Sequence, residues 1–163
     1  MKKIILITGA AGMVGSNLIN RYINQEVQII AIDSLKLGKT EHIKSFKKKK
    51  NFLFFKIDLS KKIKDRKIEN ILKKNYLHEV WHLAANSDIQ GGISDYEVDL
   101  KDTFLSTFNT LNFINKYLKK NTKLIFSSSS AIYGYVKGSI SENYNKKNPI
   151  SNYGLMKLLS EEY

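Results

Sequence analysis

Tyr153 and Lys157 are four residues apart, a spacing that places both side chains on one face of a helix. A phenol is a poor base at its ordinary pKa of about 10, and a neighbouring ammonium group stabilises the phenolate. Together the two residues predict a general base that takes a proton from a hydroxyl group. A serine run precedes them, and we expect Ser129, with Ser128 as the alternative, to hydrogen-bond the reacting oxygen. The other interpretation is a chance pairing on a helix that follows a serine-rich loop.

A glycine-rich turn lies near the start of the chain, between an apolar run and a helical pattern. We expect Gly9 to permit the tight turn, Gly12 to let the backbone touch a pyrophosphate, and Gly15 to let the helix pack closely. The helix that begins at Met13 and Val14 would then offer unpaired N–H groups and a partial positive charge to the phosphates. The turn therefore predicts a dinucleotide site, against the alternative of a purely structural turn.

Asp33 ends the second apolar run, 18 residues after Gly15. A carboxylate at that place accepts hydrogen bonds from a ribose diol and repels a 2′-phosphate, so we expect NAD rather than NADP as the cofactor. The histidines form no pattern of metal ligands, and we expect no metal. We interpret His82 as a packed strand residue and place His42 and His78 at the surface.

The elements that must position these residues follow from the period of the apolar side chains, which switches repeatedly between strand and helix. Strands are predicted over residues 2–8, 27–32, 51–57, 79–84 and 122–126. Helices are predicted over residues 13–24, 40–46, 63–75, 99–118 and 152–163. This alternation predicts an α/β fold with a doubly wound parallel sheet, in which ligands bind at the carboxyl ends of the strands.

The charge balance is strongly basic, with 27 Lys and Arg against 15 Asp and Glu and a net charge of +12. The lysines are scattered over several predicted elements, and only Arg21 and Arg66 are arginines, the residue that specific phosphate and base recognition favours. We therefore expect a lysine-rich surface rather than a nucleic-acid interface. No apolar stretch approaches the roughly 20 residues that cross a bilayer, so we expect no membrane partner. The lack of cysteine is compatible with a cytoplasmic protein.

The G-x-x-G-x-x-G spacing of the turn resembles that of the short-chain dehydrogenase/reductases. Other stretches resemble the extended branch of that family, whose members place an acid and an aliphatic residue beside the adenine and small residues along the cofactor. These stretches are Asp58-Leu59, His82-Leu83-Ala84-Ala85, Ser128 to Gly134 (S-S-x-x-x-Y-G) and Tyr153 to Lys157 (Y-x-x-x-K). A helix motif, N-x-x-G-T-x-N, is matched only in part, with Thr103 and Ser106 in place of its Asn and Gly. That departure puts the packing and an orienting hydrogen bond of this helix in question.

The resemblance implies a Rossmann-type domain that binds NAD, with Ser129, Tyr153 and Lys157 as the catalytic group and the last two also against the cofactor. Dehydratases of the family carry an acid pair after the catalytic Ser or Thr, whereas this chain has Ser130 and Ala131. The resemblance therefore favours sugar-nucleotide 4-epimerases, which oxidise the sugar at C4 to a ketone and reduce it on the other face. A dehydratase or reductase of the same family, or a non-catalytic NAD-binding module, remains the alternative.

The 163 residues are expected to form one domain, residues 1–163, that stops within the catalytic helix. The resemblance implies that the chain is the amino-terminal portion of an enzyme whose substrate lobe lies outside it. It also implies that this portion alone is inactive, and that the full-length enzyme is a homodimer that acts on a nucleotide sugar.

Overall fold

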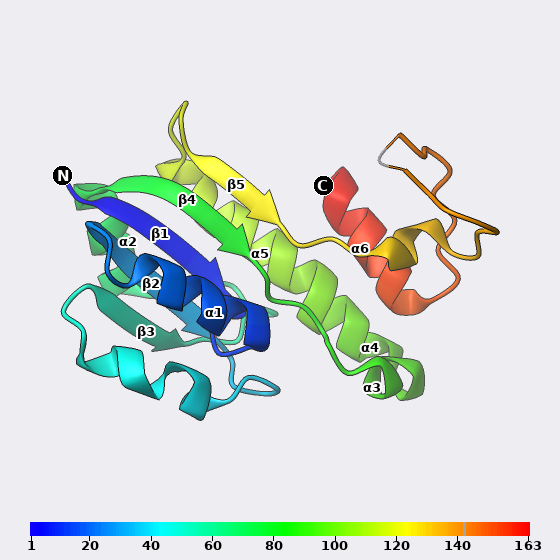
Figure 1. The fold of residues 1–163 in the computed structure, drawn as a ribbon, viewed down its shortest axis with the longest axis horizontal. Coiled ribbons are helices and arrows are strands. Elements are labelled where there is room, and N and C mark those ends of the chain that lie inside the picture. Colours follow the sequence, from blue (N-terminus) through cyan, green and yellow to red (C-terminus); the bar gives the residue numbers. More distant parts are fainter. Residues whose placement is uncertain (142) are drawn as a thin grey trace.

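A five-stranded parallel sheet forms the centre of the protein, in the strand order β3-β2-β1-β4-β5 (Figure 1). The computed structural model describes residues 1–141 and 143–163. The strands are β1 (Lys3–Thr8), β2 (Val27–Asp33), β3 (Phe52–Lys56), β4 (Tyr76–His82) and β5 (Lys123–Phe126). The predicted α/β fold with a parallel, Rossmann-type sheet is therefore confirmed.

Helical segments alternate with the strands along the chain. They are α1 (Met13–Tyr22), η1 (Thr40–Lys48), α2 (Arg66–Lys74), α3 (Ile89–Ser94), α4 (Tyr96–Asp99), η2 (Leu100–Leu105), α5 (Ser106–Ile114), η3 (Asn115–Tyr117), η4 (Ser130–Tyr133) and α6 (Asn152–Glu162). The helix predicted over residues 99–118 begins earlier, at Tyr96, and runs through a π-helical stretch, η2. The short helices α3 and η4 were not predicted, and the glycine pair in α3 explains why its sequence carries no helical signal.

The core lies in two layers, because successive side chains of a strand point to opposite faces. On one face the strands pack against α2 and α5, through Ile4, Leu6, Ile30, Ile32, Ile68, Leu72, Phe113 and Ile114. On the other face they pack against α1 and η1, through Ile5, Ile7, Ile29, Ala31, Ile19 and Ile43. Burial on both faces explains why β1 and β2 read as continuous apolar runs rather than as alternating ones.

Local contacts set the ends of the elements. Asp65 caps α2, because its Oδ1 accepts the backbone N–H groups of Lys67 and Ile68, each at 2.9 Å. The helix therefore starts after the cap, three residues later than its apolar pattern predicted. In the described part of the chain, no helix has the length and apolar character needed to cross a membrane.

A buried chain of hydrogen bonds joins β1, β4 and α5 through His82. Thr8 Oγ1 accepts the backbone N–H groups of Leu83 and Ala84 and lies 2.8 Å from His82 Nδ1. On the other side of the ring, His82 Nε2 lies 3.0 Å from Thr107 Oγ1, which itself donates to the Thr103 carbonyl. Because the Thr107 hydrogen is used, Nε2 must donate, so Nδ1 accepts the Thr8 hydroxyl hydrogen and the ring is neutral. Burial, with the charge of Lys157, lowers the pKa of His82 to about 3.

This neutral ring makes stability depend on pH. The folded-state pKa of His82 lies below its ordinary value of 6.5, so its contribution is complete above that value and is lost as the pH falls toward 3. Below about pH 6 the unfolding free energy should decline by about 1.4 kcal/mol per pH unit from this residue alone. His82→Gln, which can still donate and accept, should remove that slope in urea titrations between pH 7 and pH 4. His42→Gln, at an exposed histidine, should keep it; equal slopes for both variants would contradict the assignment.

Candidate active site

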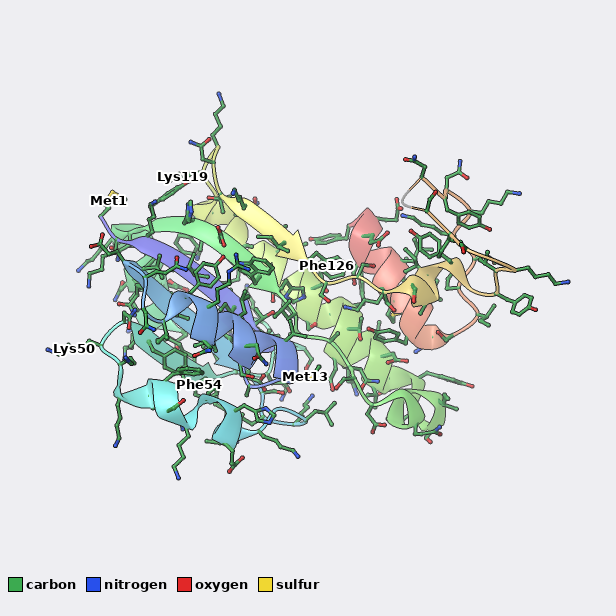
Figure 2. The ribbon with its side chains drawn as sticks, in the orientation of Figure 1. Met1, Met13, Lys50, Phe54, Lys119 and Phe126 are labelled. Carbon is green, nitrogen blue, oxygen red and sulfur yellow. The ribbon has the colours of Figure 1, made fainter. Side chains whose placement is uncertain are left out.

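A cavity of about 410 Å³ opens at the carboxyl ends of the strands. Met13 at the start of α1 and Phe126 at the end of β5 mark this edge of the sheet, opposite Met1, Lys50 and Lys119 (Figure 2). Most residues predicted to bind the cofactor line the cavity: Gly9, Gly12, Met13, Val14, Gly15, Asp33, Asp58, Leu59, Leu83, Ala84 and Ala85. Tyr153 and Lys157, which were also expected against the cofactor, are not among its lining residues and lie on α6.

The three glycines of the turn have different surroundings. Gly9 has a φ of +65°, and a Cβ on it would come within 2.9 Å of the backbone of Ala84. A Cβ on Gly15 would overlap the Gly9 carbonyl oxygen, so α1 packs here against bare backbone. A Cβ on Gly12 would approach only that same oxygen, at 3.2 Å, and would otherwise enter open space. Gly12 also caps α1 without a side-chain bond, so the first N–H groups of the helix have no side-chain acceptor at the cap, which lies in the cavity wall.

Asp33 holds two loops together at the side of the cavity. Its Oδ2 accepts the backbone N–H of Ala11 at 2.9 Å, and its Oδ1 accepts that of Leu35 at 2.7 Å. The second bond stabilises Leu35 at a φ of 60°, a left-handed conformation that costs about 1 kcal/mol or more for a residue with a side chain. A carboxylate oxygen has two acceptor positions, so each oxygen of Asp33 keeps one acceptor position beyond these bonds.

Lys36 bridges two carboxylates at the cavity wall. Its Nζ lies 2.6 Å from Asp102 Oδ1 and 3.5 Å from Asp58 Oδ2. Partial burial alone would raise the pKa of Asp58, but hydrogen bonds from Ser60 and the charge of Lys36 outweigh burial and lower it. The sequence did not indicate this pairing, because Lys36 and Asp102 are 66 residues apart and each reads as an ordinary surface charge.

His42 and the partly matched helix motif also differ from their expected roles. His42 is exposed, as predicted, but its Nδ1 lies 2.8 Å from the Ala11 carbonyl oxygen and its ring lines the cavity.

Thr103, which replaces the family's Asn, is fully buried and accepts the backbone N–H of Asn86 at 3.1 Å. Ser106, in place of Gly, donates to carbonyls of its own helix, so both replacements are accommodated.

The side chains of Ser129, Tyr153 and Lys157 meet where α6 packs on η4. Lys157 is 2% exposed, and its Nζ donates to the Ser127 carbonyl at 2.6 Å. The same ammonium lies 4.8 Å from the centre of the Phe126 ring and 5.9 Å from that of Tyr153. A Cβ on Gly154 would come within 2.5 Å of the Ala131 carbonyl oxygen, so a glycine beside Tyr153 allows this close packing.

Burial dominates the electrostatics of this group. It raises the pKa of Tyr153, against a hydrogen bond with Ser129 that lowers it, and the charge of Asp99 raises it further. Burial also lowers the pKa of Lys157 to about 8. The sequence predicted that the ammonium group of Lys157 stabilises the phenolate and so lowers the pKa of Tyr153. In the protein alone the direction is the opposite, which leaves a protonated phenol ready to donate a hydrogen bond.

Comparison with known proteins identifies the family. Residues 6–163 match the family model described as GDP-mannose 4,6 dehydratase. The chain belongs to this NAD-dependent epimerase/dehydratase family. The putative UDP-glucose 4-epimerase of Methanocaldococcus jannaschii is 29% identical over 160 residues, which cover 98% of this chain and 49% of that protein. The UDP-glucose 4-epimerase of Bacillus subtilis is 28% identical, over 97% of this chain and 46% of its own length.

Solved structures of such epimerases share the fold. The UDP-glucose 4-epimerase of Thermotoga maritima, with UDP-glucose, superposes with a TM-score of 0.81 at 31% identity, over 98% of this chain and 49% of that one. The Thermus thermophilus enzyme, in complex with NAD, gives a TM-score of 0.80 at 28% identity, over the same shares. This chain therefore spans about half the length of the epimerase/dehydratase relatives that it matches.

The contrast between Gly15 and Gly12 gives a test in the protein alone. Gly15→Ala should lower the free energy of unfolding by about 2 kcal/mol or more, because the new methyl group meets backbone that must move. Gly12→Ala should change it by less than about 1 kcal/mol, since the methyl group enters the cavity. Guanidinium titrations of both variants measure the difference. Equal losses would show that Gly12 too is packed against protein rather than left open.

Proposed function

We propose that this chain is the NAD-binding half of a nucleotide-sugar 4-epimerase. The observation that carries the proposal is that an open glycine turn, a helix N-terminus and Asp33 line the same cavity. The epimerase reaction is favoured over dehydration because Ser130 and Ala131 occupy the positions of the dehydratase acid pair. Ala131 offers no titratable group, and its N–H donates to Ser129 Oγ at 3.2 Å.

The lining residues fit NAD and its parts in order. The N–H groups at the start of α1 would hold the pyrophosphate above Gly12, and Asp33 would accept the adenine ribose hydroxyls. Asp58 and Leu59 would lie at the adenine, and the short side chains of Ala84 and Ala85, after Leu83, would leave room toward the nicotinamide. When bound, NAD supplies a hydride acceptor for the sugar carbon and returns the hydride in the second half of the reaction.

The residues of α6 and of the loop before η4 move the proton. Tyr153 accepts the hydroxyl proton of the sugar when the ketone forms and gives it back when the hydroxyl is restored. Ser129, which acts to lower the pKa of the Tyr153 phenol, would hold the reacting oxygen against it. Lys157 donates to the Ser127 carbonyl, which fixes its ammonium beside the tyrosine ring and leaves further hydrogens for a ribose or a water.

The substrate and the assembly belong to the same proposal. We assign a nucleotide sugar as the substrate, because the Thermotoga maritima relative was solved with UDP-glucose. Apolar side chains on α5 and α6 stay exposed, with Phe108 at 37%, Leu155 at 43% and Leu159 at 41%. A second copy of the chain that covers these side chains would give the expected homodimer.

The proposed proton transfer predicts a severe loss in the Tyr153→Phe variant of the complete gene product. Turnover between UDP-glucose and UDP-galactose should fall by about 10² to 10⁴, the range that a positioned acid–base group supplies, while NAD binding persists. Tyr133→Phe, a tyrosine packed on Tyr144 outside the group, serves as the matched control and should keep activity. The 163-residue chain alone should be nearly inactive. Wild-type turnover by Tyr153→Phe would refute the mechanism, and a non-catalytic NAD-binding module would show no turnover in any variant.

A further inference from the structure

Asp99 is a carboxylate buried outside the cofactor cavity. It is the last residue of α4 and is 2% exposed. Its Oδ1 accepts the side-chain amide of Asn86 at 2.7 Å, and its Oδ2 lies 3.5 Å from the side-chain amide of Asn152. A Cβ on Gly92 would come within 2.5 Å of Oδ2, so α3 approaches the carboxylate with bare backbone. The loop after β4, α3 and the distant first residue of α6 therefore converge on one acid.

The charge of Asp99 is unusual because its partners are neutral. Within residues 1–141 and 143–163, no Lys, Arg or His lies within ion-pair distance of it. Burying an ion costs several kcal/mol unless partners repay the lost hydration, and two amide groups repay only part of that cost. Packing alone would favour an amide or an apolar side chain at this position. An acid here therefore indicates a role other than packing.

Both amide partners of Asp99 are close in sequence to residues of the proposed active site. Asn152 is the first residue of α6, directly before Tyr153, and its amide also donates to the Tyr96 carbonyl at 3.1 Å. Asn86 follows the segment Leu83-Ala84-Ala85 that lines the cavity, and its amide also donates to the Asp88 carbonyl at 2.9 Å. Figure 1 shows α6 past the carboxyl end of β5, and its packing partners include η2, α3 and α4.

We propose that Asp99 is a positioning residue for Tyr153, one that ties the first turn of α6 to the loop after β4 and places a negative charge beside the phenol. This proposal rests on the function proposed above, in which Tyr153 carries the proton. Asp99 would act through Tyr153 and would not itself touch the substrate.

The surroundings of the phenol support an electrostatic effect of Asp99. After burial and the opposing Ser129 hydrogen bond, the charge of Asp99 is what raises the pKa of Tyr153 further. Lys157 faces the same ring from α6, and His82, next to Lys157, is held neutral by burial. Asp99 would thus keep the phenol protonated until a positive charge arrives nearby, which couples ionisation of the base to occupation of the site.

The test is a pH titration of tyrosine ¹³Cζ signals by NMR in the 163-residue chain, with Tyr153 assigned through Tyr153→Phe. Asp99→Asn keeps an oxygen that can accept the Asn86 amide and removes the charge, so the pKa of Tyr153 should fall by about half a pH unit or more. Asp95→Asn removes a charge from the same helix at an exposed cap, where Asn also caps well, and should leave Tyr153 unchanged. No change in Asp99→Asn, or an equal change in both variants, would overturn the electrostatic part of the proposal.

A second variant tests the link between Asp99 and the first turn of α6. This test does not require the Asp99→Asn variant to fold. Asn152→Ala keeps the Asp99 charge and the Ser151 cap of α6 but removes the link between them. Amide hydrogen exchange in the first turn of α6 should become at least about fivefold faster, while exchange in β1 stays the same. Unchanged exchange in α6 would overturn the positioning role. Neither measurement needs cofactor or substrate, so failure of NAD to bind would defeat the proposed function without deciding the role of Asp99.

Discussion

The hydrogen-bond chain from Thr8 through His82 to Thr107 fixes the relation between β1, β4 and α5. Because Thr8 Oγ1 also accepts the N–H groups of Leu83 and Ala84, the same chain determines how the backbone leaves β4. Gly9 lies against this backbone at Leu83 and Ala84, which therefore limits the shape of the turn after β1. The cavity therefore depends on a histidine that does not line it and that must stay neutral to serve both hydroxyl groups.

Two buried carboxylates then hold the loops around this frame. Asp33 accepts backbone N–H groups from the glycine turn and from the loop after β2, which places the proposed ribose site beside the proposed pyrophosphate site. Asp99 accepts amide groups of Asn86 and Asn152, which places α6 against the loop after β4. Each acid links segments that the sheet alone would leave independent. Hydrogen bonds to a buried carboxylate therefore position both the residues proposed to bind the cofactor and those proposed to transfer the proton.

The parts of this arrangement that the sequence predicted are those governed by local rules. Continuous apolar runs predicted the buried strands, and glycines at fixed spacing with Asp33 after the second strand predicted the residues that line the cavity. The ion pairs of Lys36, the role of His42 and the burial of Asp99 could not be predicted, because each depends on loops that meet only in the folded chain. The raised pKa of Tyr153 was missed for the same reason. The spacing to Lys157 is evident in the sequence, but the burial that raises the pKa of Tyr153 depends on the folded chain.

We propose that this chain binds NAD with Asp33 at the ribose hydroxyls, and calorimetric titration with NAD and NADP tests this binding most directly. We expect NAD to bind at least about tenfold more tightly, a difference of about 1.4 kcal/mol. Asp33→Asn should narrow that preference, because the charge that repels a 2′-phosphate is gone. Asp58→Asn, at the proposed adenine end, should weaken the binding of both cofactors alike. Equal affinity for the two cofactors in the unmodified chain, or a preference that survives Asp33→Asn, would contradict the account.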